Sequence, residues 1–95
     1  MSFVLSPRAQ ADIDDIWTYT LDRWGLEQAK RYVGLIGDAI AAVAANPGVG
    51  LPCDDIRAGY FGVRARSHLI FYRRVGADID VVRVLDGRKD IARRS

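Results

Sequence analysis

The chain has little from which covalent or metal crosslinks could be built. Among its 95 residues there is one cysteine, Cys53, and one histidine, His68. A single thiol excludes a disulfide within the chain, and one thiol with one imidazole cannot form a thiolate metal cage. We therefore expect Cys53 to be a small buried or half-buried side chain and the protein to need no metal or other cofactor.

Long apolar runs are missing as well. No segment approaches the ~20 apolar residues that cross a bilayer. The start, MSFVLSPRAQAD, lacks the basic region and the long apolar region of a signal peptide. With 49% hydrophobic and 27% charged residues, the composition favours a folded globular chain over a disordered one. We expect a single domain, residues 1–95, in the cytoplasm and without membrane contact.

Acidic residues are scarce in the C-terminal part of the chain. Residues 1–56 contain four Lys and Arg against eight Asp and Glu, whereas residues 57–95 contain ten against four. The net charge of +2 conceals this division. The C-terminal part is therefore a candidate for meeting an anion or an acidic partner.

The N-terminal half has the pattern of a strand and two helices. Residues 3–5 are apolar and can form a strand, and Ser6 and Pro7 are typical of a helix start. Apolar residues then recur at steps of three and four over residues 9–24, and Gly25 interrupts them.

The helical period resumes over residues 29–43 and ends at Asn46-Pro47-Gly48. So short a link between two helices predicts a helical hairpin. Gly34 and Gly37 lie inside the second helix, and we interpret them as points of close packing within the hairpin.

The C-terminal half changes to a period of two. Residues 46–59 are rich in Gly, Pro and Asp and are predicted to be a loop. Three strands follow over residues 60–66, 68–75 and 79–85, with a turn at Gly76-Ala77-Asp78. The predicted order is β-α-α-β-β-β, an α+β fold in which the helical hairpin packs on an antiparallel sheet.

Side chains that could carry out acid–base chemistry are few. His68 begins an apolar strand, with no Ser or Cys nucleophile at a recognisable spacing, so a structural role is favoured. Asp12, Asp14 and Asp15 share one helix and are interpreted as a solvated surface. We therefore predict no catalytic residue and no metal ligand in this chain.

Arginine is the distinctive residue of the C-terminal half. Guanidinium groups hold phosphate or carboxylate but do not shuttle protons at neutral pH. The set of basic side chains in this half can thus bind nucleic acid or an acidic protein. Charged residues also protect strand edges from aggregation, but this explains only part of the set. Its members are Arg64, Arg66, Arg73, Arg74, Arg83, Arg88, Lys89, Arg93 and Arg94.

The order of elements, together with LSPRAQADIDDIWTYT, NPGVGLPCDDIRAGYFGVRARSHLIFYRR and VVRVLDGRKDI, resembles the RelE/ParE superfamily of bacterial type II toxins. The resemblance extends over about residues 3–91 and is to the ParE branch. RelE-like members cut messenger RNA with an arginine in the third strand, another after the last strand, and a Tyr or His in the tail. In the alignment, Leu69 takes the position of the strand arginine, and only the arginine after the last strand is kept, as Arg88. The tail that follows, KDIARRS, contains neither Tyr nor His. A side chain at His68 is expected on the opposite strand face from Leu69.

The ParE resemblance implies a non-catalytic toxin that inhibits DNA gyrase, traps it on cleaved DNA, and is neutralised by a ParD-like antitoxin in a hetero-oligomer. Two further hypotheses stay open, a RelE-like ribosome-dependent ribonuclease and a plain nucleic-acid-binding domain, although sequence-specific nucleic-acid binding is not expected. We place the gyrase contact on Arg88, Lys89, Arg93 and Arg94. We place the antitoxin contact on Trp17, Trp24, Tyr60, Arg64, Arg66 and Arg73.

Overall fold

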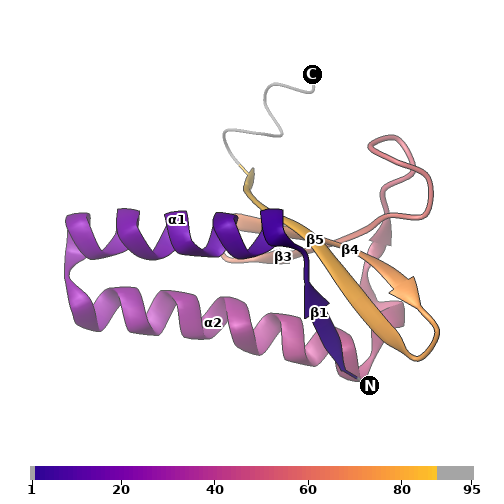
Figure 1. The fold of residues 1–95 in the computed structure, drawn as a ribbon, viewed down its shortest axis with the longest axis horizontal. Coiled ribbons are helices and arrows are strands. Elements are labelled where there is room, and N and C mark those ends of the chain that lie inside the picture. Colours follow the sequence, from indigo (N-terminus) through magenta and orange to yellow (C-terminus); the bar gives the residue numbers. More distant parts are fainter. Residues whose placement is uncertain (1, 88–95) are drawn as a thin grey trace.

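The computed structural model describes residues 2–87. Two long helices lie side by side and cover one face of a twisted sheet (Figure 1). The elements in chain order are β1 (Phe3–Leu5), α1 (Pro7–Trp24), α2 (Leu26–Ala45), the 3₁₀ turn η1 (Pro47–Val49), β2 (Leu51–Pro52), β3 (Phe61–Ala65), β4 (His68–Val75) and β5 (Asp78–Asp86).

Local signals determine where the helices begin and end. Ser6 caps α1, since its Oγ accepts a hydrogen bond from the Ala9 N–H at 3.0 Å, and Pro7 takes the first helical position. Gly25 separates the helices with a φ of 90°, a conformation that favours glycine. The predicted hairpin is confirmed, and neither helix is both long and apolar enough to span a bilayer within the described residues.

The sheet has the order β1-β5-β4-β3-β2. Strands β3, β4 and β5 form the predicted antiparallel meander, with Ile70 opposite Val84. The sheet as a whole is mixed, because β1 pairs with β5 in parallel. A parallel pair needs a long crossover, and here the sequence between the two strands includes the whole helical hairpin. Within the predicted loop, Leu51 and Pro52 add the short strand β2 beside β3.

The core lies between the hairpin and the sheet. Its largest fully buried side chains are Tyr72, Ile36, Ile40, Ile70, Ile79, Val43 and Val81. Tyr72 is 0% exposed, yet its hydroxyl is paired: it donates to the Pro47 carbonyl at 2.7 Å and accepts from the Gly50 N–H at 3.0 Å. A Cβ at Gly50 would collide with that hydroxyl. Tyr72 thereby attaches the segment after α2 to the sheet.

The prediction that Gly34 and Gly37 pack closely within the hairpin is wrong. Both are exposed, and a Cβ added to either would meet nothing within 4 Å. The buried residues of α2 are Ala29, Ile36, Ile40, Val43 and Ala44, so the two glycines occupy positions outside the packed stripe of the helix.

Candidate functional site

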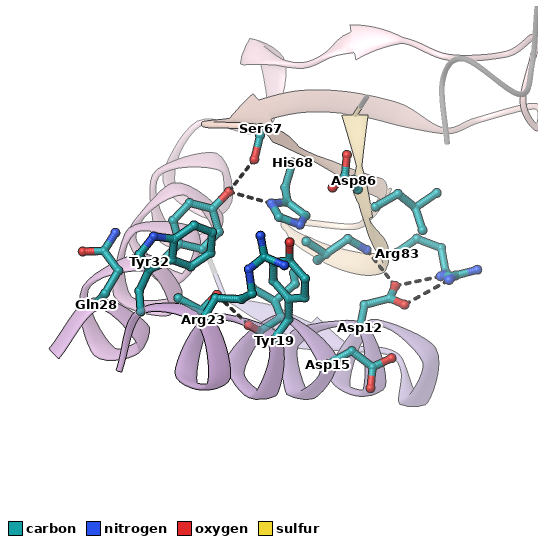
Figure 2. Close-up of a pocket in the computed structure, with 15 residues that line it drawn as sticks. Asp12, Asp15, Tyr19, Arg23, Gln28, Tyr32, Ser67, His68, Arg83 and Asp86 are labelled. Carbon is teal, nitrogen blue, oxygen red and sulfur yellow. Dashed lines mark hydrogen bonds and ion pairs between the residues drawn. The ribbon is translucent and has the colours of Figure 1, made fainter. Parts of the chain in front are cut away.

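A depression of about 1020 Å³ lies between the hairpin and the ends of β4 and β5. The hairpin extends past the sheet at the α1–α2 connection (Figure 1). The depression lies on this side of the sheet, and Figure 2 shows the residues that line it. Residues 12–32 of the helices form one wall, and Ser67, His68 and residues 83–86 form the other.

An arginine and two aromatic rings form a cluster on the helical wall. The Arg23 guanidinium lies 5.4 Å from the Tyr19 ring centroid and 5.6 Å from that of Trp24, which are cation–π distances. Tyr19 and Trp24 remain 56% and 61% exposed. Within residues 2–87 Arg23 makes no ion pair, so its charge stays available to an incoming anionic group.

Three polar side chains link the helical wall of the depression to the sheet wall. The Tyr32 hydroxyl lies 2.6 Å from His68 Nδ1 and 2.9 Å from Ser67 Oγ. Figure 2 shows this hydroxyl between the two partners, with Arg23 and Tyr19 pointing toward the same space. His68, Ile70 and Tyr72 are at every second position of β4 and share the face that points toward the helices. Leu69 lies on the opposite face, as predicted.

Asp12 is not the solvated residue that we expected. Its two carboxylate oxygens accept hydrogen bonds from Arg83 Nε at 2.7 Å and Nη2 at 2.9 Å, and Oδ2 also accepts from the Val84 N–H at 2.9 Å. The Asp12 side chain is only 14% exposed. Arg83 is therefore neutralised within the protein, which removes it from the set of arginines available to a partner. Asp14, two residues further, is exposed as predicted.

The residues predicted to bind an antitoxin do not form one surface. Trp24 lines the depression, whereas Trp17 does not and is half-buried. Arg64 and Arg66 are exposed near the β3–β4 turn, which continues into Ser67 at the edge of the depression.

The remaining two predicted antitoxin residues are further away. Tyr60 is half-buried before β3. Arg73 lies toward the other end of β4 and is paired with Asp80 at 3.0 Å.

The predicted gyrase contact, Arg88, Lys89, Arg93 and Arg94, lies outside the described residues. The described chain ends beside the depression, since Asp86 lines it and the Gly87 N–H donates to the Ser67 carbonyl at 2.8 Å.

Arg23 was missed by the sequence analysis. Its spacing of four residues from Tyr19 is a local signal, because such residues are neighbours on one helix face. The Tyr32–His68 pair has no such signal, since 36 residues separate the partners.

The described residues offer no cluster of side chains that could act as metal ligands. Among the residues that the structure describes, no group of three or more His, Cys, Asp or Glu side chains could hold an ion. Cys53 is a free, half-buried thiol, as expected.

Comparison with known proteins is consistent across sequence and fold. Residues 3–91 match the family described as the ParE toxin of the type II toxin-antitoxin system parDE. Toxin ParE1 of Mycobacterium tuberculosis is 50% identical over 92 residues, or 96% of this chain and 94% of the relative. Toxin ParE1 of Caulobacter vibrioides is 48% identical over 81 residues, or 85% and 83%. A solved structure, a chromosomal ParDE TA system from P. aeruginosa, has the same fold, with a TM-score of 0.78 and 24% identity over 90% of this chain and 95% of that one. The chain therefore belongs to the ParE toxin family of type II toxin-antitoxin systems.

Proposed function

We propose that this ParE-type toxin inhibits DNA gyrase in the bacterial cytoplasm by binding it and holding the enzyme on cleaved DNA. The observation that carries the proposal is the family match over residues 3–91, with 50% identity to a relative named as a ParE toxin. The ten basic residues after position 56 supply the charge for the target contact, which we place on Arg88, Lys89, Arg93 and Arg94.

We further propose that the toxin acts by binding and not by catalysis. Ribonucleolytic cleavage requires activation of a 2′-hydroxyl, protonation of the leaving oxygen and stabilisation of the phosphate charge. At the strand position where RelE-like enzymes resemble one another in carrying an arginine, this chain has Leu69. His68 faces the helices and is hydrogen-bonded to Tyr32, which supports a structural role for the imidazole.

The neutralising partner in this proposal is a ParD-like antitoxin. The Tyr19–Arg23–Trp24 cluster supports its placement, since exposed Trp, Tyr and Arg are the side chains enriched at binding hot spots. An acidic antitoxin side chain would meet Arg23 at the depression, and Arg64 and Arg66 beside it would add charge attraction. Arg73 would have to exchange its pair with Asp80 for an antitoxin carboxylate.

A ribosome-dependent ribonuclease is the second candidate function. This alternative would have to use the 2.6 Å contact between Tyr32 and His68, because a phenol and an imidazole at this distance can pass a proton.

One assay separates these functions. Purified toxin is added to gyrase, supercoiled plasmid and ATP, and the products are treated with detergent and protease. The expected result is linear DNA that carries covalently bound gyrase before the protease step and that does not form when antitoxin is added first. Unchanged supercoiling would contradict gyrase inhibition, and codon-dependent cleavage of ribosome-bound message in a parallel reaction would favour the ribonuclease.

A further inference from the structure

The carboxylate of Asp12 lies against β5, just beyond the residues of β5 that pair with β1. β1 pairs with β5 only over residues 79–81, although β5 continues to residue 86. Beyond that point the edge of β5 that faces away from β4 is covered by the start of α1. The Ser6 N–H donates to the Val81 carbonyl at 2.9 Å, Ser6 Oγ to the Val82 carbonyl at 3.0 Å, and the Val84 N–H to Asp12 at 2.9 Å.

The pairing between β4 and β5 is irregular at the same place. Tyr72 lies opposite Val81 and Phe71 opposite Arg83, so Val82 is an extra residue in β5. Such a bulge bends a strand and locally disrupts its ladder. The ladder between β4 and β5 is interrupted at Val82 and resumes with Arg83 opposite Phe71, so Arg83 is the first residue of β5 to pair again after the bulge.

Asp12 binds the first two residues after this bulge. It holds Arg83 by two charge-assisted hydrogen bonds and Val84 by a third, and the side chains of Asp12 and Arg83 are only 14% and 32% exposed. A bidentate carboxylate–guanidinium pair of low exposure is directional, unlike an ordinary surface ion pair.

We propose that Asp12 is a positioning residue: together with Arg83 it sets the course of β5 beyond its bulge, and so the place from which the basic segment beginning at Arg88 meets its target. This inference rests on the proposed function, which assigns the target contact to that segment. Asp12 itself touches no partner in this account. It acts on inhibition through β5. Asp12 also lines the depression, but it lies twelve residues before Trp24 on α1, about 18 Å along the helix, so the antitoxin contact placed at Trp24 does not use its side chain.

The test compares Asp12→Ala and Asp12→Asn with Asp14→Ala, a matched control on the same helix. Asp14 is exposed and accepts a hydrogen bond from Gln10 one turn earlier on the same helix. Each toxin is assayed for growth inhibition, gyrase inhibition, antitoxin affinity and amide hydrogen exchange. Potency is expressed per antitoxin-binding-competent molecule, so that partial unfolding does not count as lost positioning.

We expect Asp12→Ala to lower potency about tenfold while antitoxin affinity changes by less than about twofold. Amide exchange should accelerate at residues 84–87 and stay unchanged at Ile70 and Val81. Asp12→Asn should fall between, because its amide oxygen still accepts from Val84 while the ion pair is lost. Asp14→Ala should match the unmodified toxin.

Three results would overturn the inference: full potency of Asp12→Ala, an equal loss in Asp14→Ala, or unchanged exchange at residues 84–87. If Asp12→Ala fails to fold, Asp12→Asn and Arg83→Lys carry the same comparison. Failure of the proposed function has a different signature, because the unmodified toxin would then leave gyrase unaffected. Growth inhibition and amide exchange would still report on positioning.

Discussion

Tyr32 of α2 and His68 of β4 are hydrogen-bonded through the phenol oxygen and Nδ1 at 2.6 Å, and Ser67 completes the group at 2.9 Å. The contact joins the helical hairpin to the first residue of a sheet strand. It is also the arrangement within the depression that most resembles a proton-transfer pair.

The first prediction concerns this pair. Tyr32→Phe should lower the free energy of unfolding by about 1 kcal/mol, because one hydroxyl and its hydrogen bonds are lost. Inhibition per folded molecule should persist in Tyr32→Phe and in His68→Gln if the contact is structural. Urea unfolding and growth-inhibition assays test this. RNA cleavage by the unmodified toxin that is abolished in His68→Gln would instead show that the toxin is an enzyme.

The second prediction concerns the buried hydroxyl of Tyr72. Tyr72→Phe leaves the Pro47 carbonyl and the Gly50 N–H without their partner, which should cost about 1–3 kcal/mol of stability. Gly50→Ala should also destabilise, because its Cβ would meet the same hydroxyl. Gly48→Ala, whose Cβ would be 3.8 Å from its nearest neighbour, is the matched control. Equal midpoints for the two alanine variants would contradict this account.

The third prediction is a pH dependence from the same residue. Burial raises the pKa of Tyr72 above its ordinary value of 10.0. The folded state therefore holds this proton more tightly than the unfolded state, so the contribution to stability is complete below pH 10 and is lost as pH rises from 10 through the folded-state pKa. Thermal midpoints of the unmodified toxin and Tyr72→Phe should draw together over that alkaline range. A constant difference would disprove the linkage.

The fourth prediction concerns the antitoxin contact. Trp24→Ala should weaken the antitoxin complex by about 2 kcal/mol, roughly thirtyfold, as truncation of a hot-spot side chain does. Stability should change little, because Trp24 is 61% exposed. Leu26→Ala is the control, since Leu26 is also exposed on the hairpin but does not line the depression. Calorimetric titration measures both, and equal affinities would place the contact elsewhere.

The fifth prediction concerns the two glycines of α2. Gly34→Ala and Gly37→Ala should each stabilise the free toxin by about 0.5–1 kcal/mol, since alanine favours helix and nothing lies within 4 Å of the new Cβ. Chemical denaturation measures this gain. A loss of antitoxin affinity in either stabilised variant would reveal a partner packed closely on this face, and a loss of stability would refute the packing described for α2.

The site illustrates how far a single sequence can be interpreted. Trp24, which we predicted to contact the antitoxin, lines the depression, and the contact itself stays a prediction. Arg73 was assigned to an antitoxin, but a carboxylate directly opposite on β5 already holds it. The spacing of charges along the chain cannot reveal such pairing, because strand register decides which side chains face one another.

The sequence by itself determined the two helices and the strands β1, β3, β4 and β5, since a helix cap at Ser6, the break at Gly25 and the change of hydrophobic period are all local properties. Only the tertiary structure decided that β1 runs parallel to β5 and that Asp12 neutralises Arg83 across 71 positions. The physical reason is that electrostatic and hydrogen-bonding partners are chosen by distance in space, and packing of the helical hairpin on the sheet sets those distances.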